Sequence, residues 1–123
     1  DVGEIKRILN SFLVFIEQDQ SNSLIIAATN LPNSLDQALF RRFDDVINYP
    51  LPNIDTIVIT LEKSFKGFEF NENFSFAGIA KKALGLNYSE IVKASEDTIK
   101  EMILQGNNRL SKKALIKSIE LRK

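Results

Sequence analysis

The stretch that decides the fold is LIIAATNLPNSLDQALFRRFDDVINYPLP, residues 24–52. It opens with a continuous apolar run, residues 24–29, which is typical of a strand buried on both faces of a parallel sheet. A turn at residues 30–34 leads into a short helix that Ser34 can cap. Residues 45–51 indicate a second short strand, which proline terminates. The stretch therefore predicts α/β architecture.

Helical patterns lie on both sides of this stretch. Residues 4–17 carry apolar side chains at i, i+3, i+4 and i+7 spacing, which indicates a helix with one apolar face. Four more helices are expected: one capped by Asn53 or Asp55 and ending near Ser64, one over residues 75–84, one opened by Asn87 or Ser89 and ending near Leu104, and one capped by Ser111. Residues 1–52 thus mix helix and strand, and residues 53–123 are all helical.

The chain length and the small number of predicted strands suggest that the complete fold includes residues beyond this sequence. The 123 residues are enough for one ordinary domain or two small lobes. Two parallel strands do not make a complete sheet, because such strands need neighbours and helices on both faces. We therefore expect a larger N-terminal part before Asp1. The phenylalanines between residues 65 and 76 are expected to fill the core of the helical part.

Composition excludes several classes of function. The 16 basic and 16 acidic side chains cancel, which argues against a general nucleic-acid or membrane-surface binder. The chain has no cysteine and no histidine, which excludes thiolate or histidine metal sites and histidine acid–base catalysis. No apolar run approaches the roughly 18 residues of a membrane-spanning helix, and the N-terminus does not resemble a signal peptide. We expect a cytoplasmic protein, since the lack of cysteine fits a reducing compartment.

Asn30 is the first candidate for a functional residue. It follows the predicted strand directly, and ligands of open α/β sheets bind beyond the carboxyl ends of the strands. Its amide can donate and accept hydrogen bonds, so it could hold a water molecule against a phosphate. An asparagine that merely ends a strand in a turn would give the same pattern.

Arg41 and Arg42 are the second candidates. They lie at the C-terminal end of the short predicted helix, where cations complement the helix dipole. Alternatively, one of them reaches out of its own subunit to a nucleotide bound by a neighbour. Guanidinium matches phosphate geometry and stays charged, and an arginine supplied in trans can stabilise a transferring γ-phosphoryl group.

The whole run resembles the second region of homology of AAA-type ATPases, within the AAA+ class of P-loop enzymes. The matching positions are Thr29-Asn30, Pro32, Leu35-Asp36, Ala38-Leu39, Arg41-Arg42, Phe43-Asp44 and Pro50. A pattern with so many fixed positions is far more specific than a lone glycine-rich motif. The resemblance extends over essentially the whole chain. It makes residues 1–52 the C-terminal part of the α/β nucleotide-binding core and residues 53–123 the α-helical lid.

The resemblance assigns roles to the candidate residues. Asn30 takes the sensor-1 role and positions the attacking water near the γ-phosphate. Arg41 and Arg42 take the arginine-finger role toward the next subunit of a ring. Many members separate the two arginines by Pro-Gly, whereas here they are adjacent, so the resemblance leaves open which one is the finger. Gly85 and Asn87 lie on the lid side of the nucleotide.

The lid stretch GLNYSEI, residues 85–91, is similar to a family motif near the adenine and ribose. Within it, Tyr88 and Ile91 are expected in the helix core rather than at the ligand. The phosphate motif GxxxxGK[ST] and an apolar strand ending in paired acids are both missing from the sequence. The resemblance places these ligands of ATP and Mg²⁺ upstream of Asp1, so the chain alone is expected to be inactive.

The function that the resemblance implies is ATP hydrolysis in a ring oligomer, with a hexamer expected, coupled to the remodelling or unfolding of a protein substrate. Two other functions stay open: a non-catalytic AAA-like interaction module, and a nucleic-acid-handling loader subunit of the AAA+ class. The absence of a lid arginine at residues 87–91 argues against the loader. Neither a nucleic-acid partner nor a membrane segment is expected.

Overall fold

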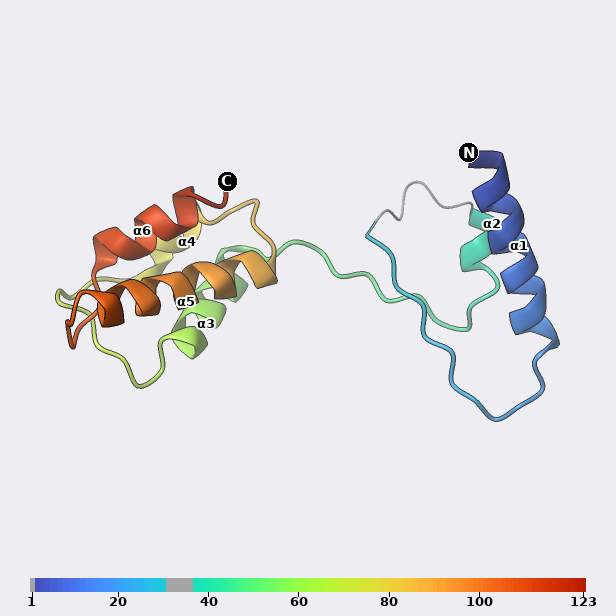
Figure 1. Ribbon diagram of the computed structural model, residues 1–123, viewed down its shortest axis with the longest axis horizontal. Coiled ribbons are helices and arrows are strands. Elements are labelled where there is room, and N and C mark those ends of the chain that lie inside the picture. The colour runs from blue at the N-terminus through green and yellow to red at the C-terminus, as the bar shows by residue number, and fades with distance from the viewer. Residues whose placement is uncertain (1, 31–36) are drawn as a thin grey trace. The chain divides into compact units, whose positions relative to one another are not determined.

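The computed structural model describes residues 2–30 and 37–123 (Figure 1). The chain divides into two compact units, Asp1–Asn48 and Tyr49–Lys123, here called the N-terminal unit and the helical unit. The functional candidates Asn30, Arg41 and Arg42 belong to the first unit, and Gly85 and Asn87 belong to the second.

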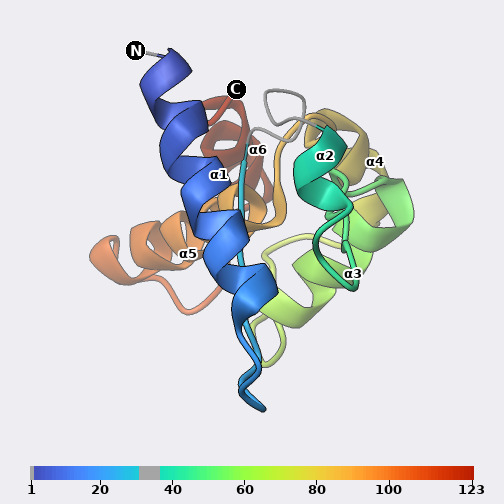
Figure 2. The ribbon, with the colours of Figure 1, turned by 90° about the vertical axis from the view of Figure 1, so that its right-hand side faces the viewer.

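The N-terminal unit begins with α1, Val2–Gln18, which is one continuous helix (Figure 2). Its Leu13 is only 2% exposed. The helix is followed by a tight turn in which the Asp19 carboxylate accepts hydrogen bonds from the Ser21 backbone N–H at 3.0 Å and the Ser21 hydroxyl at 2.9 Å. These two hydrogen bonds lower the pKa of the Asp19 carboxyl. The helix confirms the pattern read at residues 4–17.

The two predicted strands are absent from the part of the chain that the structure describes. Residues 24–29 and 45–51 are irregular chain, and Leu24 and Ile26 are 85% and 82% exposed. A strand exists only through a ladder of hydrogen bonds to a neighbouring strand, and no such ladder forms along these segments within the described residues. Among the described residues, the one isolated β-bridge joins Phe70 and Leu110, which both belong to the helical unit. The apolar run has β-forming composition, but the described residues contain no sheet for it to join.

A short helix, α2, spans Gln37–Phe40 and precedes the arginine pair. It ends in turns in which the Arg41 N–H donates to the Gln37 carbonyl at 3.4 Å and the Phe43 N–H donates to the Phe40 carbonyl at 3.3 Å. The proposed cap Ser34 lies outside the described residues, as do Pro32, Leu35 and Asp36 of the family pattern.

The helical unit contains four helices: α3 (Ile54–Ser64), α4 (Phe76–Lys82), α5 (Tyr88–Leu104) and α6 (Lys112–Glu120). Their N-caps are Asn53, Ser75, Asn87 and Ser111, and each cap side chain accepts a hydrogen bond from a backbone N–H of the first turn. These caps satisfy donors that a helix end otherwise leaves unpaired. The four predicted helices are confirmed.

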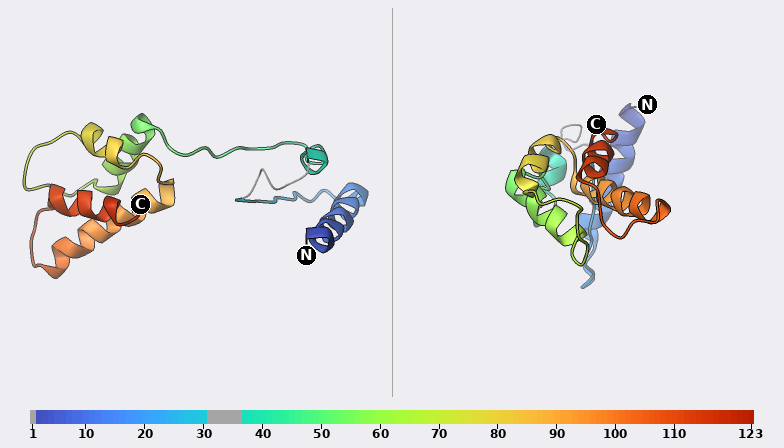
Figure 3. Two further views of the ribbon diagram at one scale, coloured as in Figure 1. Left: turned by 90° about the horizontal axis from the view of Figure 1, so that it is seen from above. Right: turned by 90° about the vertical axis from the view of Figure 1, so that its left-hand side faces the viewer.

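The core of the helical unit is a single apolar cluster to which all four helices contribute. The members are Ile57, Leu61, Phe65, Ile79, Ala80, Ala83, Leu86, Ile91, Ala94, Leu110, Leu115 and Ile119. Helix α3 packs on α4 and α5, and α5 lies beside α6 (Figure 3). Phe65 is buried, and its ring meets Phe70 and Phe76 at centroid distances of 5.1 and 6.0 Å. Phe65 thus lies in the core as predicted, and Phe70 and Phe76 are partly buried and pack against it, whereas Phe68 is 40% exposed.

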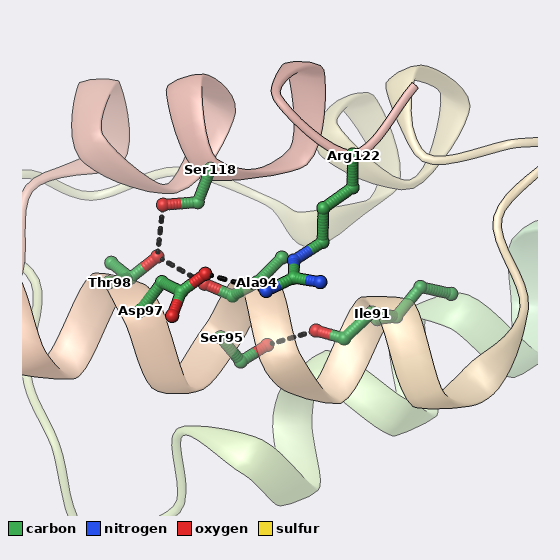
Figure 4. A network of polar contacts seen from close by, with 7 residues as sticks. All are labelled: Ile91, Ala94, Ser95, Asp97, Thr98, Ser118 and Arg122. Atoms are coloured by element: carbon green, nitrogen blue, oxygen red, sulfur yellow. Dashed lines mark hydrogen bonds and ion pairs between the residues drawn. The ribbon is translucent and has the colours of Figure 1, made fainter.

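Polar side chains join α5 to α6 next to this core (Figure 4). Thr98 is 1% exposed, and its hydroxyl donates to the Ala94 carbonyl at 2.8 Å. Ser118 on α6 lies with its hydroxyl oxygen 3.5 Å from that of Thr98. At the end of α6, Arg122 Nη2 donates to Asp97 Oδ2 at 2.8 Å. The contacts link residues that are far apart in the sequence and fix how α6 lies on α5.

Candidate functional site

The N-terminal unit holds the residues predicted to act on phosphate. Asn30 lies at a bend directly after the apolar run and is exposed. An exposed amide at this position is accessible to a water molecule or a phosphate oxygen. Within the described residues no hydrogen bond links Asn30 to Arg41 or Arg42. The structure therefore places the three residues in one unit without joining them into one contact network.

The two adjacent arginines differ in their surroundings. The Arg42 side chain is 32% exposed, and its Nε lies 3.5 Å from Glu17 Oε1 near the end of α1. Arg41 is exposed, and no ion pair is recorded for it among the described residues. Glu17 was not predicted as a partner, because its position in the sequence carries no sign of this contact. The N-terminal unit thus offers one partly neutralised guanidinium and one exposed guanidinium.

Gly85 and Asn87 both lie just before the first residue of α5 in the helical unit. Gly85 has φ of +98°, a backbone conformation that side-chain-bearing residues rarely adopt. The Asn87 Oδ1 accepts from the Glu90 N–H at 2.8 Å, and Glu90 Oε2 accepts from the Asn87 N–H at 2.9 Å. This reciprocal capping box occupies the acceptor of the Asn87 amide. The amide nitrogen is the part of Asn87 that stays available to a ligand.

The two residues of the lid stretch that were expected in the helix core, Tyr88 and Ile91, differ in burial. Ile91 is 0% exposed and confirms the core prediction, whereas Tyr88 is 44% exposed and does not lie in the core. Its ring lines a surface groove of about 380 Å³ between α3 and α5. The helical period places residue 88 close to the buried face, but the first turn of a helix lies at the edge of the core and leaves its side chains partly uncovered.

The described residues contain no group of three or more carboxylates, cysteines or histidines that could hold a metal ion. The exposed Asn30 amide and Arg41 guanidinium have chemistry that fits a nucleoside triphosphate. The amide can orient a water molecule, and the guanidinium can neutralise phosphate charge. No helix within the described part of the chain is long and apolar enough to cross a membrane.

Comparison with known proteins identifies the family. The family described as "ATPase family associated with various cellular activities (AAA)" matches residues 1–51. An uncharacterized AAA family ATPase of Sinorhizobium fredii is 32% identical over 96% of this chain. The chain belongs to the AAA family of ATPases. The resemblance carried by the arginine-containing stretch is thereby confirmed.

Other relatives in this family have more specific names. The meiotic spindle formation protein mei-1 of Caenorhabditis elegans is 33% identical over 71% of this chain and 20% of its own length. The ATP-dependent zinc metalloprotease FtsH of Mycoplasmopsis synoviae is 37% identical over 82% of this chain and 15% of its own length. This chain spans 35% of the Sinorhizobium AAA ATPase. It therefore corresponds to a minor part of each of these relatives.

A solved structure has the same fold. A chain from work on the structural basis for katanin self-assembly matches with a TM-score of 0.72 over 97% of this chain and 48% of that chain, at 24% identity. The likeness shows that this AAA chain has the fold of that structure over nearly all its length. It adds no information about activity.

Proposed function

We propose that the complete AAA protein to which these residues belong hydrolyses ATP to ADP and phosphate between the subunits of a ring, with six subunits expected. The observation that carries the proposal is the exposed Arg41 guanidinium beside Arg42, within the stretch that matches the AAA family. An arginine can promote ATP hydrolysis only where its guanidinium contacts a phosphate group of the nucleotide. A ring supplies that phosphate by presenting the nucleotide of a neighbouring subunit.

Each candidate residue has a chemical role in the proposed reaction. The Asn30 amide orients the attacking water by accepting its hydrogen bond, while its N–H₂ group donates to a γ-phosphate oxygen. An arginine from the next subunit stabilises the negative charge that develops on the equatorial phosphate oxygens. Both groups act by position and charge, and neither forms a covalent bond to phosphorus.

Arg41 is the stronger candidate for the finger. It is exposed, whereas Arg42 is partly covered and lies 3.5 Å from Glu17. An arginine must be free to leave its own surface if it is to reach another subunit. Arg42 would instead position Arg41 by holding the end of α2 next to α1. Both residues remain part of the proposed site.

The proposed cofactors of the complete protein are ATP and Mg²⁺. This sequence contains no GxxxxGK[ST], so the main phosphate and metal ligands are proposed to lie upstream of Asp1. The chain alone is therefore proposed to be inactive. Residues 1–52 are proposed to form the end of the nucleotide-binding core, and residues 53–123 are proposed to form the lid. Gly85 and the Asn87 amide nitrogen are proposed to lie on the lid side of the nucleotide. A cytoplasmic location remains a prediction.

The proposed substrate is a protein. Relatives with AAA domains carry names such as ATP-dependent zinc metalloprotease, and the solved structure concerns katanin self-assembly. These names describe those proteins, and they support self-assembly and action on proteins for this one. Hydrolysis would drive motion of the lid against the core and move the substrate.

The test uses the complete natural protein. Arg41→Ala is expected to reduce kcat by about 10³-fold, the lower range for an arginine finger, while ATP affinity stays within about twofold. Arg109→Ala is the control, because Arg109 is an exposed arginine of the helical unit that lies outside the proposed site and pairs with Glu69 at 3.5 Å. Equal loss of ATP affinity and turnover in Arg41→Ala would contradict the finger role.

A mixing experiment tests action between subunits. Arg41→Ala subunits keep their own water-orienting asparagine, and Asn30→Ala subunits keep their own arginine. Mixed rings of the two inactive variants therefore contain some interfaces with both groups intact, and they are expected to regain turnover. Rings that form but show no recovery would place the arginine in its own subunit. A complete protein that assembles and never hydrolyses ATP would instead be an interaction module.

A further inference from the structure

The helical unit carries another hollow, which is lined by residues that the proposed ATPase chemistry does not use. It has a volume of about 490 Å³ and lies between the segment that leads from α3 into α4 and the connection between α5 and α6. We call it the loop pocket, and its lining includes Glu69, Phe70, Glu72, Phe74, Phe76 and Arg109. None of the residues proposed to act on ATP lines it.

Two backbone hydrogen bonds hold the two sides of the loop pocket together. The Leu110 N–H donates to the Glu69 carbonyl and the Asn71 N–H donates to the Leu110 carbonyl, both at 2.8 Å. Leu110 is 0% exposed and belongs to the apolar cluster, so it anchors both segments to the core. The loop pocket is therefore formed before any ligand binds, and a ligand does not have to order it.

Phe70 presents unpaired backbone groups at the other edge of this bridge. Leu110 bonds to the residues on both sides of Phe70, so the N–H and C=O of Phe70 itself point to the opposite edge of the extended segment. No hydrogen bond is recorded for either group within the described residues. Because buried backbone groups are rarely left unpaired, these two groups meet water in the free chain. They can pair with another extended chain in its place.

Three aromatic rings form the apolar part of the lining. The centroid of the Phe74 ring lies 4.7 Å from that of Phe70 and 5.4 Å from that of Phe76, and both pairs are nearly perpendicular. All three rings are partly buried against the apolar cluster. Lys112 Nζ lies 5.4 Å from the Phe74 centroid, so this ring already receives a cation of the chain itself. The lining suits a side chain with an apolar stem and a cationic end.

Glu72 is the charged residue of the lining that is left without a partner. Glu69 Oε2 lies 3.5 Å from Arg109 Nη2, so these two charges offset each other. Glu72 is exposed, and no ion pair is recorded for it in the part of the chain that the structure describes. A guanidinium stacks on aromatic rings and donates paired hydrogen bonds to a carboxylate. An arginine side chain therefore complements both the rings and the carboxylate.

We propose that the loop pocket binds an extended segment of a partner protein that carries an arginine. One residue of the segment exchanges both backbone hydrogen bonds with Phe70, as opposed residues do in an antiparallel pair. Opposed residues place their side chains on the same face, with Cβ atoms about 4.5–5.5 Å apart. An arginine at that position lies beside the Phe70 ring and pairs with Glu72. The proposal does not depend on the proposed ATPase function.

The test uses the full chain and short synthetic peptides that differ only at the central position, which is arginine or glutamate. Threonine and valine alternate on both sides of it and favour an extended chain. Fluorescence anisotropy in low salt is expected to show at least tenfold tighter binding of the arginine peptide, and high salt is expected to reduce the difference. Glu72→Arg is expected to reverse the preference. Glu62→Arg, at an exposed position of α3 outside the loop pocket, is the matched control and is expected to preserve it.

N-methylation of the arginine peptide tests the backbone pairing separately. A methyl group on the nitrogen of the central arginine removes the donor to the Phe70 carbonyl, and binding is expected to weaken about fivefold. The same modification one residue later is the control, because the N–H groups of successive residues point to opposite edges of an extended chain. Its affinity is expected to stay within about twofold of the unmodified peptide.

Several results would overturn the proposal. These are failure of the arginine peptide to bind, equal affinity of the two peptides in low salt, a preference that Glu72→Arg leaves unchanged, and equal weakening by N-methylation at both positions. Circular dichroism checks that each variant is folded, so a lost preference cannot be assigned to unfolding. Concentration-dependent dimers in sedimentation that Glu72→Arg abolishes would show that a second copy of this chain occupies the loop pocket.

Discussion

Asn87 combines two roles that substitution can separate. Its Oδ1 caps α5 through the Glu90 N–H at 2.8 Å, and its amide nitrogen is the proposed donor to the nucleotide. Asn87→Ala removes both groups. Loss of an N-cap side chain costs about 1 kcal/mol, and in a domain of this size each kcal/mol lowers Tm by about 4–8 °C. Helix α5 packs against both α3 and α6, so the whole helical unit should report the loss.

Asn87→Ser keeps an oxygen that can cap the helix and removes only the amide donor. We expect its Tm to stay close to that of the natural chain. In the complete protein, ATP affinity should fall about fivefold, because a net hydrogen bond contributes about 1 kcal/mol. Thermal unfolding followed by circular dichroism measures the cap, and equilibrium ATP binding measures the donor. Asn73→Ala, in an exposed loop, is the matched control.

Two results would refute this reasoning. An Asn87→Ala chain that unfolds at the temperature of Asn73→Ala would show that the capping box contributes no stability. An Asn87→Ser protein with unchanged Tm and unchanged ATP affinity would show that Asn87 caps the helix and does nothing at the nucleotide.

Three other substitutions, with Leu104→Ala as an exposed control, test the helical unit in thermal or denaturant unfolding. Leu61→Ala should cost about 3 kcal/mol, because the side chain is 0% exposed and its removal leaves a cavity, whereas Leu104→Ala at 86% exposure should cost less than about 0.5 kcal/mol. Gly85→Ala should cost about 1–2 kcal/mol, since φ of +98° strains any residue with a Cβ; an unchanged Tm would contradict that. Asp97→Asn should cost less than about 1 kcal/mol, and only in low salt, because its 2.8 Å pair with Arg122 is partly exposed.

The sequence predicts the helical unit well because the signals for its helices are local. Asn53, Asn87 and Ser111 each precede an apolar helical period, and each caps the helix that was expected. The pattern left two choices, Asn53 or Asp55 and Asn87 or Ser89. In both cases the residue farther from the helix interior is the cap, because its side chain can reach the free N–H groups of the first turn.

The strands could not be predicted from the same kind of information. Residues 24–29 have the composition of a buried strand, but composition reports only that the segment suits a sheet. Whether it becomes a strand depends on hydrogen bonds to residues elsewhere, and no local pattern specifies them. The Arg42–Glu17 and Arg122–Asp97 contacts are similar cases, because each joins residues that the sequence separates widely.

The sequence predicts which residues the candidate site contains, but it does not predict which other residues contact them. The stretch around Arg41 and Arg42 identified the family, yet nothing in it distinguished one arginine from the other. Glu17 supplies that distinction, because it lies next to Arg42. The exposure of Tyr88 was not predicted for a related reason. Its helical spacing indicates a core position, but the spacing does not tell whether another helix covers the side chain.

The two units differ in where their apolar side chains lie, and this difference determines what each kind of experiment measures. The apolar cluster of buried residues belongs to the helical unit. In the N-terminal unit, by contrast, one face of α1 is exposed at Ile5, Ile8, Phe12 and Phe15, by 57%, 64%, 48% and 69%. Unfolding assays on this chain will therefore report mainly the helical unit, because nearly all the buried apolar side chains among the described residues belong to it. The roles of Asn30 and Arg41 require turnover measurements in the complete protein, because their proposed work depends on groups that this chain does not contain.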